Sequence, residues 1–91
     1  MAEFLVEVYV PRTDQAAAER GAERARTAAE QLAAEGAPIR YLRSIFVPED
    51  ETCFHLYTAA SAAEVDAAAR RAALGFDRIA EAISESRGET R

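Results

Sequence analysis

The chain of 91 residues contains no tryptophan and no lysine, and only one cysteine, one histidine and one methionine. One cysteine cannot form an internal disulfide, and the first residues carry acidic side chains where a secretion signal carries basic ones. We therefore expect a reducing, cytoplasmic location. No apolar run approaches the ~20 residues that a membrane-spanning helix needs, so a membrane partner is not expected.

The sequence also lacks the motifs of several common activities. It has no glycine-rich phosphate loop, no paired-cysteine zinc pattern and no Ser-His-Asp arrangement. The formal net charge is −5, and no basic aromatic stripe interrupts this acidic balance, so nucleic acid is not an expected partner. No residue can be given a catalytic role from the sequence alone.

The length and composition predict one domain over residues 1–91 with a thin core. The hydrophobic fraction is 49%, but much of it is alanine, which buries little area per residue. Because burial of apolar surface stabilises a fold by roughly 25 cal/mol per Å², such a chain gains from pairing with a second copy. We expect a homodimer on this ground.

The spacing of apolar residues and of capping residues predicts six elements in the order βαββαβ. They are a strand over 3–10, a helix from Asp14 to Gly36, strands over 39–47 and 52–58 joined by a turn, a helix from Ser61 to Leu74 that Gly75 stops, and a strand over 77–84. A helical turn is the alternative for the last segment, and residues 85–91 are predicted to be a frayed tail.

This order is typical of an α+β, ferredoxin-like sandwich, in which both helices cover one face of the sheet. The other face stays open. Two copies that pack these faces together form a dimeric α+β barrel with a cavity between the sheets. We expect that cavity to bind a small molecule or a metal ion.

The candidate site depends on which residues face the cavity. Alternation places Cys53 and His55 on one face of their strand and Phe54 and Leu56 on the other. We expect the two larger apolar side chains to face the helices, so that His55 faces the cavity with Glu7. The predicted ligand-binding set is Glu7, Tyr9, Tyr41, Arg43, His55 and Tyr57. The pattern of residues 39–47 fits both faces and leaves the register of that strand open.

Several uses of this set remain open. Glu7 could orient His55 for acid or base chemistry, as in a cofactor-independent isomerase or monooxygenase with Arg43 holding an anionic substrate. Glu7, His55 and Cys53 could instead contribute to a site for a divalent transition metal such as nickel. The third alternative is an interaction module in which the tyrosines fill the cavity, and in each case simple packing competes with function.

Five short segments carry a resemblance that spans nearly the whole chain. They are Phe4 to Glu7, Tyr41 to Ser44, Phe54 to Ala59, Ala69 to Ala72 and Asp77 to Ile79. In their order and spacing the chain resembles a family of small bacterial proteins of unassigned function, the DUF4242 type, some of which are described as nickel-binding. The resemblance implies a dimeric ferredoxin-like fold, with Glu7 carried over and His55 in the place of a sulfur ligand. The family pattern has an acidic residue at the position of Thr58 and a histidine at that of Ala68.

Overall fold

The computed structural model describes residues 1–85, so nearly all of the predicted tail over 85–91 lies outside the described residues. Its elements are β1 (Ala2–Tyr9), α1 (Gln15–Ala34), β2 (Ile39–Val47), the 3₁₀ turn η1 (Pro48–Asp50), β3 (Thr52–Ala59), α2 (Ala62–Arg71) and β4 (Arg78–Ala82). The order βαββαβ and the α+β, ferredoxin-like class are confirmed. The last segment is a strand, so its helical alternative is wrong.

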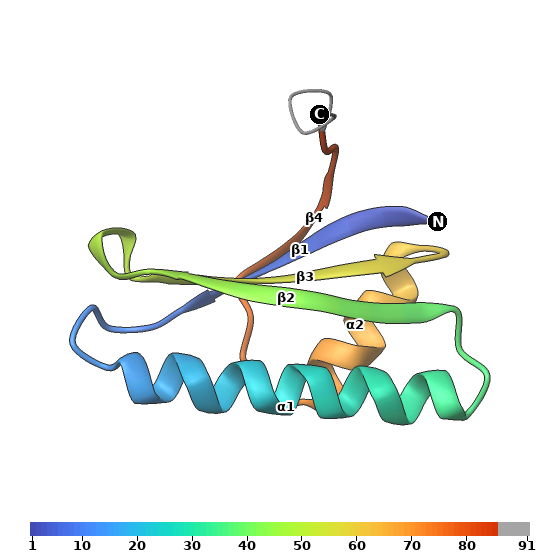
Figure 1. Ribbon diagram of the computed structural model, residues 1–91, viewed down its shortest axis with the longest axis horizontal. Helices are drawn as coiled ribbons and strands as arrows, with labels where there is room; N and C mark the ends of the chain where they lie inside the picture. Colours follow the sequence, from blue (N-terminus) through green and yellow to red (C-terminus); the bar gives the residue numbers. More distant parts are fainter. Residues whose placement is uncertain (86–91) are drawn as a thin grey trace, which may run out of the picture.

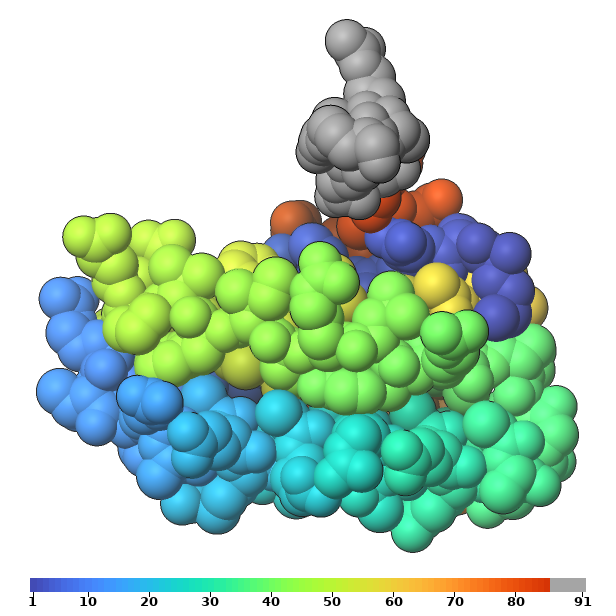
Figure 2. Space-filling view, in the orientation of Figure 1, coloured from blue at the N-terminus to red at the C-terminus, as the bar shows by residue number. Residues whose placement is uncertain are grey.

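The four strands form one antiparallel sheet in the order β2-β3-β1-β4. Both helices lie on the same side of this sheet, and its other side carries no helix (Figure 1). The space-filling view shows the side chains of α1 and β2 as two adjoining layers (Figure 2). We call these two sides the covered face and the open face.

The ends of the helices follow local chemistry. The Asp14 carboxylate accepts a hydrogen bond from the backbone N–H of Ala17 at 3.0 Å, which caps the start of α1. Gly36 follows the end of α1 with a φ of +99°, a conformation that glycine adopts without strain. α2 ends earlier than predicted, at Arg71, and both Ala73 and Gly75 after it have a positive φ, of 55° and 62°.

The covered face of β3 carries the residues that we expected on the open face. Cys53, His55 and Tyr57 are buried beneath the helices, whereas Phe54 and Leu56 are only partly buried on the open face. The prediction was wrong because alternation fixes which residues share a face but not which face the helices cover. The alanine-rich helices pack closely against this mixed set of side chains.

A β-bulge explains why the pattern of β2 fitted both faces. Tyr41 lies opposite Tyr57 on the covered face, but Arg43 lies opposite Leu56 on the open face, with Leu42 as the extra residue between them. The bulge exchanges the two faces for the rest of the strand. Consequently Ser44 returns to the covered face, directly opposite His55.

Among the helices of residues 1–85, none is long and apolar enough to cross a membrane.

Candidate functional site

The sheet register separates the two residues on which the predicted site depended. Glu7 lies opposite Phe54 and belongs to the open face, whereas His55 lies opposite Val6 and belongs to the covered face. A side chain on one face of a sheet cannot orient an imidazole on the other. The predicted cavity shared by Glu7 and His55 is therefore wrong, and with it the acid–base pair.

Three residues of the predicted set lie on or beside the open face. The Glu7 carboxylate accepts a hydrogen bond from Arg78 Nε at 2.7 Å, in an ion pair between β1 and β4. Arg43 is exposed on β2, with β3 between it and β1. Tyr9 ends β1 and is 59% exposed.

The remaining predicted residues gather beneath the helices, where a hydrogen-bonded chain through Ser44, which the sequence analysis did not single out, joins Tyr41 to His55. The Ser44 hydroxyl lies 2.6 Å from His55 Nδ1 and 2.6 Å from the Tyr41 hydroxyl. Tyr41 and Ser44 are three residues apart, and in a regular strand they would point to opposite faces. The bulge at Leu42 places both on the covered face and so makes this chain possible.

His55 is held in its neutral form. Its side chain is 1% exposed, and burial, followed by the nearby positive charge of Arg24, lowers its pKa from 6.5 to about 4. At neutral pH the imidazole therefore carries one N–H and one lone pair. Nδ1 is hydrogen-bonded to the Ser44 hydroxyl. Nε2 is therefore the ring nitrogen that remains available to bind a ligand.

The two other buried polar side chains of β3 are less suited to chemistry. Burial raises the pKa of the Cys53 thiol, which opposes formation of the nucleophilic thiolate. The Tyr57 hydroxyl is buried without a hydrogen-bond partner, and its pKa is raised by burial and then by Tyr41. The rings of Tyr41 and Tyr57 meet edge to face, 5.8 Å apart.

A cavity of about 150 Å³ lies between the first half of α1 and the sheet. Its lining comprises Val8, Tyr9, Val10, Ala17, Ala18, Gly21, Arg24, Cys53, His55 and Leu74. A Cβ atom at Gly21 would lie 3.9 Å from His55 Nε2, so this glycine leaves room beside the imidazole edge. Sequence reasoning missed Gly21 and Arg24, although a glycine inside an alanine-rich helix is a signal of close approach.

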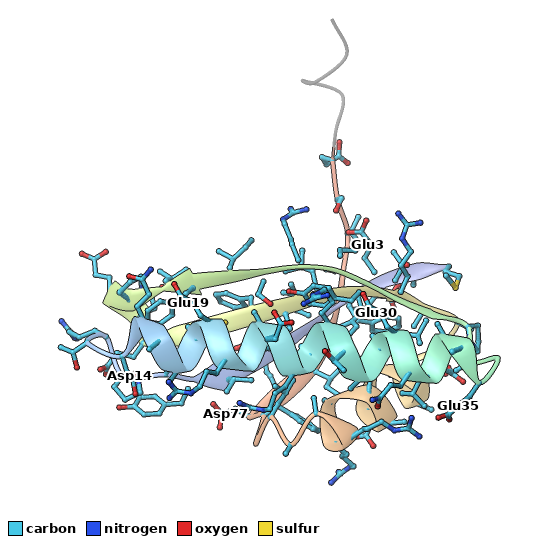
Figure 3. The ribbon with its side chains drawn as sticks, turned by 60° about the horizontal axis from the view of Figure 1, so that its bottom comes forward. Glu3, Asp14, Glu19, Glu30, Glu35 and Asp77 are labelled. Atoms are coloured by element: carbon cyan, nitrogen blue, oxygen red, sulfur yellow. The ribbon has the colours of Figure 1, made fainter. Side chains whose placement is uncertain are left out.

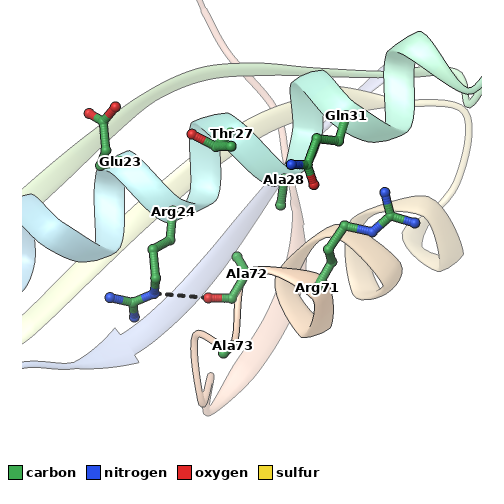
Figure 4. Close-up of a pocket in the computed structure, with 8 residues that line it drawn as sticks. All are labelled: Glu23, Arg24, Thr27, Ala28, Gln31, Arg71, Ala72 and Ala73. Atoms are coloured by element: carbon green, nitrogen blue, oxygen red, sulfur yellow. Dashed lines mark hydrogen bonds between the residues drawn. The ribbon is translucent and has the colours of Figure 1, made fainter.

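A larger and more open hollow of about 340 Å³ lies between the two helices. Figure 4 shows its lining, including Arg24, whose Nε donates a hydrogen bond to the carbonyl oxygen of Ala72 at 2.9 Å. Arg24 contributes to both cavities. The 340 Å³ hollow is more open than the 150 Å³ cavity, so the smaller cavity encloses its lining side chains better.

The predicted metal set does not fit a metal in one subunit. Residues 1–85 contain no group of three or more histidine, cysteine, aspartate or glutamate side chains that could hold an ion. The labelled carboxylates lie apart from one another, from Asp14 at the start of α1 to Glu35 at its end (Figure 3). His55 and Cys53 share the covered face, but the positive charge of Arg24 near His55 opposes a cation there.

The comparisons with known proteins give a family and a fold. Residues 4–82 match the family described as "Nickel responsive protein SCO4226-like", and the chain belongs to that family. The crystal structure of SCO4226 from Streptomyces coelicolor A3(2) is similar, with a TM-score of 0.63 and 20% sequence identity over 92% of this chain and 99% of that one. No curated protein matches. The resemblance to a small nickel-related family is thus confirmed, and the DUF4242 label stays a prediction.

Proposed function

We propose that this protein is a small cytoplasmic binding protein of the nickel response, which works as a pair of copies joined through their open faces. The cavity between the two sheets holds its ligand, a divalent metal such as nickel, with Glu7 as the anchoring side chain. The observation that carries the proposal is the uncovered apolar face with a carboxylate on a central strand. Membership of a family described as nickel responsive supports the choice of ligand.

The open face has the character of an interface. Large apolar side chains stand near its centre, namely Leu5, Phe54, Leu56 and Ile45, and Ile45 is 42% exposed. With two central strands of eight residues, the whole sheet face measures about 26 Å by about 19 Å, or roughly 500 Å². This is of the same order as the ~800 Å² that each partner buries in a stable complex. The apolar side chains occupy the centre of this face and charged ones stand around them, which favours a partner there.

Pairing would also supply the metal-binding side chains that one copy lacks. Residues 1–85 of one copy hold no cluster of three metal donors, but a twofold pair presents every open-face residue twice, including Glu7. The Arg78 guanidinium now neutralises Glu7 and would have to release it when a cation binds. His55 takes no part, because it lies on the covered face.

Calorimetric titration with Ni²⁺ tests this assignment. We expect saturable binding at a stoichiometry below one ion per chain, lost in Glu7→Gln and retained in His55→Gln. Glu49→Gln is the matched control, since it removes an exposed carboxylate from η1, outside the four strands of the sheet. Equal heats in wild type and Glu7→Gln, or loss of binding in His55→Gln alone, would contradict the assignment.

The enzymatic alternative loses its support in this fold. It required Glu7 to orient His55, and the register places them on opposite faces. The non-catalytic interaction module predicts pairing without any ligand, so it would be the conclusion if the copies associate and the titration shows no heat.

A further inference from the structure

We propose that the 150 Å³ cavity beneath α1 binds a short-chain monocarboxylate between His55 Nε2 and the guanidinium of Arg24. This site lies on the covered face and is independent of the ligand proposed for the open face. The inference rests on an unused polar atom, a charged group beside it, apolar walls and a glycine that keeps the space open.

The unused atom is His55 Nε2. The His55 ring is almost fully buried, and its Nδ1 is engaged by Ser44 at 2.6 Å. Within residues 1–85 no hydrogen bond to Nε2 is formed, although the ring lines the cavity and its Nε2 edge faces Gly21. An imidazole nitrogen that borders a cavity and has no protein partner is available to hydrogen-bond with a ligand there.

The hydrogen-bonded chain on the other side of the ring determines what Nε2 can do. Tyr41 can donate to the Ser44 hydroxyl, which then donates to His55 Nδ1. In this arrangement the proton of the neutral imidazole resides on Nε2, which becomes a hydrogen-bond donor towards the cavity. The ligand atom that it meets must be an acceptor.

Arg24 supplies the charge. Its Nε is fixed by the carbonyl oxygen of Ala72, and in Figure 4 its two terminal nitrogens point away from that carbonyl. No hydrogen bond from these terminal nitrogens is formed with another residue of the described chain. A guanidinium with a free edge binds a carboxylate strongly and with defined geometry.

The walls and the size limit the rest of the ligand. Apolar side chains, including Val8, Val10 and Leu74, form part of the lining beside its polar groups. A volume of about 150 Å³ equals the share of roughly five water molecules. This space suits a carboxylate with a tail of one to three carbons. Phosphate would bring further charge and no apolar part, and a metal cation would be repelled by Arg24.

A titration of ¹⁵N-labelled protein with propionate, followed by NMR, tests the proposal. We expect saturable shifts of the Gly21 and Arg24 amides and of the His55 side-chain ¹⁵N signals. Propionamide has the same shape without the charge and should shift them at least about tenfold less efficiently, as expected for loss of a charge-assisted hydrogen bond. Equal responses to propionate and propionamide, or shifts confined to the open face, would overturn the proposal.

Two variants sharpen this test. Gly21→Ala places a methyl group beside Nε2 and should abolish propionate binding, while its melting temperature stays equal or rises because alanine favours the helix. Arg24→Gln should weaken binding about tenfold or more. Arg20→Gln, which removes an exposed arginine from the same helix, should leave binding unchanged. If Gly21→Ala bound propionate as well as the wild type, the proposed site would be wrong, regardless of the result for Arg24→Gln.

The two sites can fail separately. Glu7→Gln should bind propionate as the wild type does, and Gly21→Ala should titrate with Ni²⁺ as the wild type does. If Glu7→Gln lost propionate binding, the carboxylate site would be misplaced.

Discussion

The two faces of this sheet differ in a way that their residue types would not suggest. The covered face carries a histidine, a cysteine and two tyrosines beside apolar core residues such as Phe4, Val6 and Ile39, whereas the open face carries aliphatic and aromatic side chains of similar size without any helix over them. Apolar side chains of this size usually lie inside a protein. Their position on the uncovered side supports the pairing proposed above.

The two faces also differ in the charge state of their polar side chains. On the open face Glu7 and Arg78 neutralise each other near water. On the covered face His55 is uncharged at neutral pH, and its Nδ1 is hydrogen-bonded to Ser44. The comparison therefore separates the proposed assembly surface from an internal polar site, and four changes test this difference.

The largest effect is expected at the centre of the open face. Leu56→Arg would place a charge in the proposed interface, and we expect the self-association constant to fall at least about 100-fold, or about 3 kcal/mol. Sedimentation velocity over a concentration series measures this. Ala63→Arg, on the exposed start of α2, is the control that should associate normally. A wild-type protein that stays monomeric at high concentration would remove the assembly surface from the comparison.

The next effect concerns His55 and pH. In the unfolded chain its pKa is near the ordinary 6.5, and in the fold it is about 4, so between these values the unfolded state binds more protons. This part of the stability is complete above pH 6.5 and is lost as the pH falls towards 4. We expect about 2 kcal/mol of loss between pH 7 and pH 5.

Urea unfolding at several pH values checks this expectation. His55→Gln removes the titrating group, so the wild-type curve minus the variant curve isolates its contribution. If the difference in the free energy of unfolding between wild type and variant did not change from pH 7 to pH 5, the imidazole would not be held neutral by the fold.

A smaller effect, of opposite sign, is expected from the buried hydroxyl of Tyr57. Tyr57→Phe removes a hydroxyl that has no partner and keeps the ring that packs edge to face on Tyr41. We expect the free energy of unfolding to rise by about 1 kcal/mol. Tyr41→Phe makes the same chemical change but breaks the bond to Ser44, and should lower stability by a similar amount. If both variants lowered the free energy of unfolding by the same amount, the Tyr57 hydroxyl would have to be hydrogen-bonded in solution.

The smallest effect is expected at Glu7. The ion pair with Arg78 is partly exposed, with side-chain exposures of 23% and 65%, and such pairs contribute little. Glu7→Gln should change the free energy of unfolding by less than about 0.5 kcal/mol. Thermal unfolding measures it, and a loss above 1 kcal/mol would assign Glu7 a structural rather than a ligand-binding role.

The sequence was sufficient for the elements but not for the site. The spacing of Phe4, Val6 and Val8 and the cap at Asp14 predicted β1 and the start of α1, because these signals are local. The face of β3 that meets the helices depends on packing between elements far apart in the chain, and no local pattern records it. Choosing the side of Phe54 and Leu56 as core followed hydrophobicity, which fails when a second surface also needs apolar groups.

Ser44 shows a second reason why the site could not be predicted. Its place beside His55 depends on one unpaired residue in β2, and strand alternation has no signal for such an insertion. Gly21, in contrast, could have been found, because a glycine in a helix interior costs stability and needs an explanation.

Leu42 also gives β2 one place where its length can change safely. A deletion there would leave Tyr41 and every later side chain of the strand on its present side, and would only straighten the backbone. A deletion farther from the bulge would turn the residues on one side of it over to the opposite face. Related chains with a β2 one residue shorter can therefore keep the same buried polar chain, provided that the missing residue is this one.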